Sequence, residues 1–257
     1  MINVIIGAYI FVLGSIFASF FGVIIDRVPV EKSIISPKSK CDNCGHELKW
    51  YENIPIFSYI FLGGKCSKCK CKINKFLFIY EIIGGLSLLL VFIKYGLTVE
   101  CIIIELIVLM MLLIAGYDYK TNLILDVFLY ILAFLNICLF CYRVFILKYY
   151  WLNYVISALI GLLFFGIIKI VMSKILNKDA LGTGDIYLVT IMGLSFIPIK
   201  HLLAISIASL VGSIFAIILI KLSKKQREAE IAFCPYLCLG YYIIFIFGEY
   251  LLKLLLR

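Results

Sequence analysis

The chain alternates between long apolar stretches and short polar connections, with one exception near its beginning. A membrane-spanning helix needs roughly 20 mostly apolar residues. About eight stretches approach or reach that length, near 3–25, 77–94, 101–117, 123–142, 152–172, 186–197, 202–220 and 232–252. The stretch at 186–197 is the shortest, and we expect a tilted or partial span there. The pattern predicts an all-α, polytopic membrane protein of about eight transmembrane helices.

Composition supports the same class. Hydrophobic residues make up 64% of the chain, charged residues 15%, and the mean hydropathy is +1.12. A soluble domain of this length could not bury so much apolar surface. No basic residue precedes Ile5 and no small-x-small cleavage site precedes Asp26, so we expect the first stretch to be a retained span rather than a signal peptide.

The exception to the pattern is the segment 26–76. It holds 15 charged residues and five of the ten cysteines of the chain. The sequence therefore predicts three parts: a first transmembrane helix at 1–25, a small cytoplasmic domain at 26–76, and a transmembrane bundle at 77–257.

The placement of the basic residues predicts the orientation in the membrane. Eight spans would place four segments on the same side of the membrane: 26–76, 118–122, 173–185 and 221–230. These segments hold 17 of the 24 Lys and Arg residues, and the segments on the other side hold only six. Cytoplasmic loops carry such an excess, so the long first loop is expected in the cytoplasm. Anionic lipid headgroups are sufficient partners for these charges, and we expect no nucleic-acid partner.

The cysteines of the polar segment form two pairs, Cys41-Asp-Asn-Cys44 and Cys66-Ser-Lys-Cys69. Four thiolates in two such pairs can converge on a structural zinc ion, which would supply the folding energy that this short, polar segment lacks. The alternatives are disulfides, which a cytoplasmic location disfavours, and a redox pair. Cys71 is a fifth cysteine nearby, and the choice between Cys69 and Cys71 as a ligand stays open, although the spacing favours Cys69.

Carboxylates in or beside the apolar stretches are costly and therefore mark candidate functional positions. They are Glu81, Glu105, Asp118, Asp126, Asp185 and Glu249. In the predicted topology Asp118 ends the third span, Asp126 lies just inside the fourth and Asp185 begins the sixth. Three acids from different helices therefore fall on one side of the membrane.

Asp185 closes the sequence Gly182-Thr-Gly184-Asp185. Two glycines before an acid at a helix start allow close approach of an extended substrate strand. A helix-capping aspartate after a flexible turn explains this short pattern equally well. Two other functions also fit the residues: a transporter or channel that uses the carboxylates for ions or protons, and a membrane scaffold that docks partners through its cysteine loop.

Taken in order, several motifs make the chain resemble the type IV prepilin peptidases, a GxGD aspartyl protease family of bacteria. The matching segments are Gly14-Ser15 with Arg27-Val28-Pro29, the two cysteine pairs, Asn53-Ile54-Pro55, Tyr80-Glu81, Asp118 to Asp126, Leu181 to Leu188, and Phe233-Cys-Pro235. The chain departs from the family pattern at Leu125, at Tyr187 and at Phe76-Leu77-Phe78, none of which touches the two aspartates or the paired cysteines.

The resemblance implies that Asp118 and Asp185 are the catalytic pair, that Gly182 and Gly184 belong to the active-site loop, and that Asp126 is either a supporting acid or a helix cap. It implies cleavage of the leader of prepilins or pseudopilins at the cytoplasmic face of the bacterial plasma membrane. It also implies methylation of the new N-terminus with S-adenosylmethionine as the donor, and it favours this activity over an ion- or proton-coupled transporter or another GxGD protease.

Overall fold

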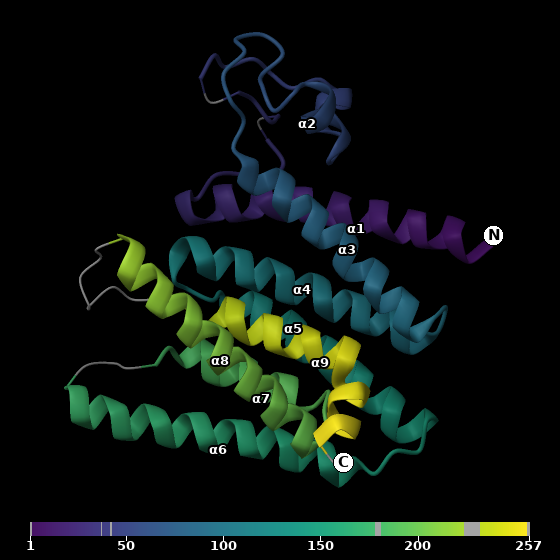
Figure 1. Ribbon diagram of the computed structural model, residues 1–257, viewed down its shortest axis with the longest axis vertical. Helices are drawn as coiled ribbons and strands as arrows, with labels where there is room; N and C mark the ends of the chain where they lie inside the picture. The colour runs from purple at the N-terminus through teal and green to yellow at the C-terminus, as the bar shows by residue number, and fades with distance from the viewer. Residues whose placement is uncertain (1, 37, 42, 178–180, 224–231, 256–257) are drawn as a thin grey trace. The chain divides into compact units, whose positions relative to one another are not determined.

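The computed structural model describes residues 2–255 except 37, 42, 178–180 and 224–231, and divides into two compact units, 1–96 and 97–257 (Figure 1). Seven helices in the described part are long and apolar enough to cross a membrane. The chain is therefore an all-helical, multi-pass membrane protein, as predicted. Five of the basic residues counted for the predicted orientation lie outside the described residues, namely Lys178, Lys224, Lys225, Arg227 and Arg257.

The first unit is built on two helices, α1 (Ile2–Arg27) and α3 (Lys75–Tyr95), which pack against each other. Their closest approach is at glycines: a Cβ atom added to Gly14 would lie 2.4 Å from the carbonyl oxygen of Gly84. A Cβ atom added to Gly85 would lie 2.5 Å from the Oγ atom of Ser15. Small residues at such a crossing let the backbones touch, which is how helices gain packing energy where lipid removes the hydrophobic driving force.

The polar segment joins these two helices and contains three short helical turns, η1 (Val28–Val30), η2 (Trp50–Asn53) and α2 (Phe57–Phe61). It is fastened to α3 by the buried Glu81, whose Oε2 atom accepts a hydrogen bond of 2.8 Å from the backbone N–H of Ile56. The ring of Tyr59 also stacks on that of Phe78, with 4.4 Å between centroids. The loop is thus held by one buried carboxyl group and one aromatic pair.

The described residues of the second unit form six helices and a π-helical turn: α4 (Val99–Thr121), α5 (Asp126–Cys141) continued by η3 (Tyr142–Ile146), α6 (Trp151–Leu176), α7 (Thr183–Gly193), α8 (Pro198–Ser223) and α9 (Cys234–Leu255). The helices pack side by side, α4 on α5 and α9, and α8 on α6 and α9 (Figure 1). Large apolar side chains remain exposed along α5, α6 and α8, as expected for surfaces that face lipid.

The apolar stretch at 186–197, which the sequence predicts to be a tilted or partial span, forms a short helix. This 11-residue helix, α7, is too short to be one of the seven candidate spans. At ~1.5 Å per residue its length is about half of the hydrocarbon core. α7 packs against α5, α6, α8 and α9, and Leu188, Val189 and Met192 are fully buried. A short helix with non-helical ends is tolerated at this depth because protein surrounds it.

A buried polar network closes one end of the second unit. The Arg143 guanidinium pairs with Glu100 at 2.8 Å and donates a hydrogen bond to the carbonyl oxygen of Ser195, just beyond α7. The Ser195 hydroxyl in turn donates to the side-chain oxygen of Asn136, which is fully buried in α5. These bonds join the start of α4, the end of α5 with its π-helical continuation, and the end of α7.

The glycine crossing of the first unit gives a test of the packing. We expect Gly14→Ala to lower the free energy of unfolding by about 1–3 kcal/mol, because the new methyl group meets backbone that cannot move away. Gly166→Ala in α6 is the matched control, since a Cβ atom there meets nothing within 4 Å. The measurement is thermal unfolding of both variants in detergent, and equal midpoints would contradict the crossing.

Candidate active site and cysteine cluster

Asp118 lies in the last turn of α4 and is 6% exposed. The helix ends just beyond it, where Asn122 adopts a left-handed conformation and its N–H bonds the carbonyl oxygen of Asp118 at 2.8 Å. The carboxyl group accepts a hydrogen bond from the backbone N–H of Cys234, the first residue of α9. Its Oδ2 atom is buried and has no partner among the described residues, so it is free to bind a proton or a water molecule.

Asp185 lies in the first turn of α7, at the end of the unit opposite the Arg143 network. The charge of Asp118 acts directly on its carboxyl group, and the Cys234 thiol interacts with both charges. The capping position of α7 belongs to Gly182, and no side chain caps the helix. The fold therefore brings the two predicted aspartates together from α4 and α7, and Asp185 is not the helix cap.

At position 184 there is room for glycine and not for a larger residue. A Cβ atom added there would lie 3.0 Å from the Cβ atom of Ile124, in the short connection between α4 and α5. A Cβ atom added to Gly182 would lie 3.6 Å from an oxygen of Asp185, which is ordinary contact. Gly184 thus lets α7 approach the α4–α5 connection closely.

Asp126 lies at the same end but in a different environment. It is exposed in the first turn of α5, whose capping residue is Leu125, and no side chain caps this helix either. The structure therefore shows no capping role for Asp126. A carboxylate in a first turn still interacts favourably with the helix dipole.

The remaining acids have other partners. Glu81 holds the loop backbone at Ile56, and Glu105 accepts a weak hydrogen bond from the Cys101 thiol at 3.6 Å. Glu249 pairs with Lys200. None of these contacts involves Asp118 or Asp185, so the paired carboxyl groups are distinct among the membrane acids.

Four of the five cysteines of the first unit form one cluster. The Sγ atoms of Cys41, Cys66, Cys69 and Cys71 all lie within 4.8 Å of one another. The Sγ distances of Cys41 to Cys69 and to Cys71 are 3.8 and 3.5 Å. Zn–S bonds of about 2.3 Å in a tetrahedron place sulfur atoms ~3.8 Å apart, so the donor set and its spacing fit a zinc ion.

The membership of this group differs from the prediction in one position. Cys71 takes the place expected for Cys44, whose exposed side chain has its Sγ atom 3.9 Å from that of Cys66. Hydrogen bonds from the backbone N–H and the thiol of Cys71 lower the pKa of Cys69 to about 6. A thiolate at neutral pH is the form that binds a metal ion.

Glu52 ties the two cysteine turns to each other. Its buried carboxylate accepts hydrogen bonds from Ser67 and from the backbone N–H of Lys49, and these lower the pKa of Glu52. It also lies 3.3 Å from the Nε2 atom of His46. His46 follows the first cysteine pair and Ser67 lies within the second, so one carboxylate bridges both turns.

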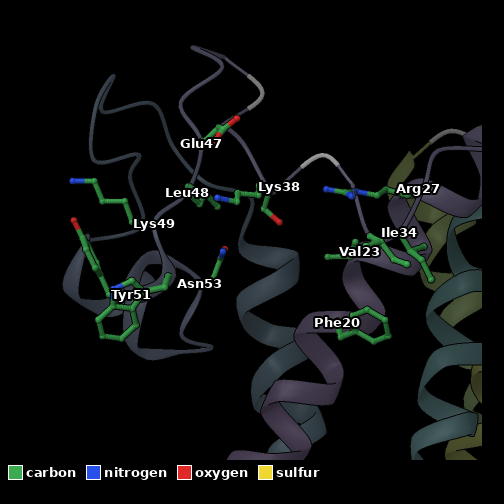
Figure 2. A pocket seen from close by; sticks show the side chains of 13 residues that line it. Phe20, Val23, Arg27, Ile34, Lys38, Glu47, Leu48, Lys49, Tyr51 and Asn53 are labelled. Atoms are coloured by element: carbon green, nitrogen blue, oxygen red, sulfur yellow. The ribbon is translucent and has the colours of Figure 1, made fainter.

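A pocket of about 680 Å³ opens between the end of α1 and the loop (Figure 2). Phe20 and Val23 of α1 form its apolar floor. Three cations, Arg27, Lys38 and Lys49, and a single carboxylate, Glu47, line it with further side chains. The lining is therefore amphipathic and net positive.

Fold and site together define a class: a polytopic membrane protein with a carboxyl pair at the ends of its helices and a cysteine cluster in a polar loop. Two family models match the chain. The bacterial peptidase A24 N-terminal domain matches residues 12–95, and the type IV leader peptidase family matches residues 105–217. The chain belongs to the type IV leader peptidase family, the prepilin peptidases, as the sequence motifs predicted.

Curated relatives carry the same family name. The chain is 30% identical to the prepilin leader peptidase/N-methyltransferase of Myxococcus xanthus, over 82% of this chain and 62% of that protein. The relative of the same name from Pseudomonas aeruginosa is 26% identical in sequence, over 95% of this chain and 91% of that protein. The one from Bacillus subtilis is 24% identical, over 96% of this chain and 97% of that protein. No solved structure matches the chain. The alternative of an ion-coupled transporter finds no support among these relatives.

Three features of the site were not predicted. The backbone N–H of Cys234 holds Asp118, and Ile124 packs on Gly184. Glu81 anchors the loop rather than serving a membrane carboxyl site. The signal for the first was the Phe233-Cys-Pro235 segment, because proline is common in the first turn of a helix, where backbone N–H groups have no partner within the helix.

Gly184 and Gly182 form a matched pair for testing the active-site loop. We expect Gly184→Ala to reduce peptidase activity at least about tenfold, because displacing α7 misplaces Asp185. Gly182→Ala should have a much smaller effect. Ile124→Ala removes two of the three nearest atoms and should partly restore activity in the Gly184→Ala background. Equal losses in the two single variants would exclude this packing role.

Proposed function

We propose that this chain is a membrane aspartyl endopeptidase that removes the leader of type IV prepilins or pseudopilins and methylates the new N-terminus. The observation that carries the proposal is the pairing of Asp118 and Asp185 at one end of the second unit, in a chain of the leader peptidase family. Relatives from three bacteria bear both activities in their names.

The paired carboxyl groups suit peptide hydrolysis. A second ionisation of two interacting carboxyl groups is costly, since the second charge would face the first in a poorly solvated site. The ionised carboxylate takes a proton from water, and the protonated one polarises the scissile carbonyl group. The unpartnered Oδ2 atom of Asp118 supports this arrangement, because it offers a buried acceptor for the shared proton or the water.

The position of the pair suits a membrane-anchored substrate. A prepilin carries a short basic leader followed by a hydrophobic helix. That helix can lie against the exposed apolar faces of the bundle while the cleavage junction reaches Asp118 and Asp185 at the helix ends. The excess of Lys and Arg in the same-side segments supports a cytoplasmic site in the bacterial plasma membrane.

Methylation requires S-adenosylmethionine, which transfers a methyl group from its sulfonium to the new amine. The pocket of Figure 2 does not fit this donor by charge. The donor is net positive, and so is the lining formed by Arg27, Lys38, Lys49 and Glu47. An anionic lipid headgroup matches the lining better, with its acyl chains on Phe20 and Val23 at the end of the first span.

The assignment of the aspartates is tested by Asp118→Asn and Asp185→Asn. Each should lower the cleavage rate by about 10²–10⁴-fold, because one member of the acid–base pair can no longer exchange a proton. Asp126→Asn is the control and should retain most of the activity, since Asp126 is exposed and outside the pair. The measurement is the mass of a prepilin precursor after incubation with purified enzyme. Normal processing by either pair variant would remove the assignment.

The cysteine loop is proposed to hold a structural zinc ion. Cys41→Ser or Cys66→Ser should release the metal and destabilise residues 26–76, because the segment has few buried apolar residues of its own. We expect methylation to suffer more than cleavage. Zinc per chain is measured by elemental analysis, and limited proteolysis reports the loop. One zinc per chain in both variants would contradict the ligand assignment.

A further inference from the structure

The first cysteine turn has a defined hydrogen-bond pattern. The backbone N–H of Cys41 donates to the carbonyl oxygen of His46 at 2.9 Å. The N–H of Gly45 donates back to the carbonyl oxygen of Cys41, also at 2.9 Å. Gly45 has a φ of 68°, which turns the chain immediately after Cys44.

The second turn repeats this pattern at the same spacing. The backbone N–H of Cys66 donates to the carbonyl oxygen of Cys71 at 2.9 Å, and that of Lys70 donates to the carbonyl oxygen of Cys66 at 3.1 Å. Lys70 has a φ of 60°, and it follows Cys69 as Gly45 follows Cys44.

Aligning the hydrogen-bond patterns of the two cysteine turns gives each residue of the first turn an equivalent residue in the second. Cys44 corresponds to Cys69, whose thiol belongs to the cluster. Cys44 therefore occupies the equivalent position in the first turn. Cys71 corresponds to His46, which is turned to Glu52 instead. Cys71 is therefore a thiol added to the second turn at a position that is not a ligand in the first.

The Cys71 thiol belongs to the cluster, and the Cys44 thiol lies next to it. The Sγ atom of Cys44 lies 3.9 Å from that of Cys66, and the Sγ atom of Cys71 lies 3.5 Å from that of Cys41. Each distance is close to the ~3.8 Å edge of a tetrahedral zinc–thiolate site. Structural zinc takes four ligands, so five thiols leave one over.

We propose that Cys41, Cys66 and Cys69 are constant ligands of the zinc ion and that Cys44 and Cys71 are interchangeable fourth ligands. Zinc has no geometric preference from its d electrons, so exchanging one thiolate for a neighbouring one costs little. The site therefore keeps its metal when either of the two thiols is lost to oxidation or alkylation. This inference rests on the proposed zinc ion and not on the peptidase activity.

The test uses the full-length protein in detergent and measures zinc per chain by elemental analysis. Cys44→Ser and Cys71→Ser should each keep about one zinc, while the double variant should lose it under mild chelation. Cys138→Ser in α5 is the control, since Cys138 lies in a span outside the loop. Loss of zinc from one single variant would show a fixed fourth ligand, and full zinc in the double variant would show that neither thiol binds; both results overturn the proposal.

A second measurement avoids variants that fail to fold. Alkylation of the zinc-loaded wild-type protein should modify one thiol of residues 26–76 per chain, divided between Cys44 and Cys71, without metal release. Modification at only one of the two positions, or at neither, would overturn the proposal. Cleavage of a precursor by the same preparation reports the peptidase activity separately, so failure of one assignment does not imply failure of the other.

Discussion

The architecture of this protein depends on the free-energy cost of leaving a backbone N–H or carbonyl group without a hydrogen bond in hydrocarbon. It forces the chain into helices wherever lipid is the solvent, and it confines free N–H and carbonyl groups to helix ends. There they are taken by side chains: the first N–H of α9 holds Asp118, and the carbonyl of Ser195 beyond α7 is held by Arg143. Asp118 is held at such a helix end, because the first N–H groups of a helix have no partner within it and can donate to a side chain.

Much of the fold followed from the sequence, because apolar length is a strong signal in a membrane protein. The spans and the polar loop were predictable from residue type and position, whereas the pairing of Asp118 with Asp185 was an implication of the family resemblance. The short helix α7 was predicted only as a weak span, since its burial depends on four neighbouring helices and not on its own residues. The contact of Cys234 with Asp118 is likewise a property of packing between segments far apart in the chain.

The two candidate centres are stabilised by different kinds of interaction. In the second unit, packing of α7 against its neighbours keeps Asp118 and Asp185 together against their mutual repulsion. In the loop, few apolar side chains are buried, and the thiol cluster and Glu52 provide the fixed points. The first centre therefore depends on shape complementarity between helices, and the second on the metal it is proposed to bind.

The two cysteine turns are alike in hydrogen bonding but unequal in conformational cost. Gly45 adopts its positive φ freely, whereas Lys70 has a side chain in the same region of backbone space, at a cost of about 1–2 kcal/mol. That cost must be met by interactions that exist only in the assembled loop. Without them the second turn has the greater drive to leave its folded conformation, so it depends on the assembled loop more than the first turn does.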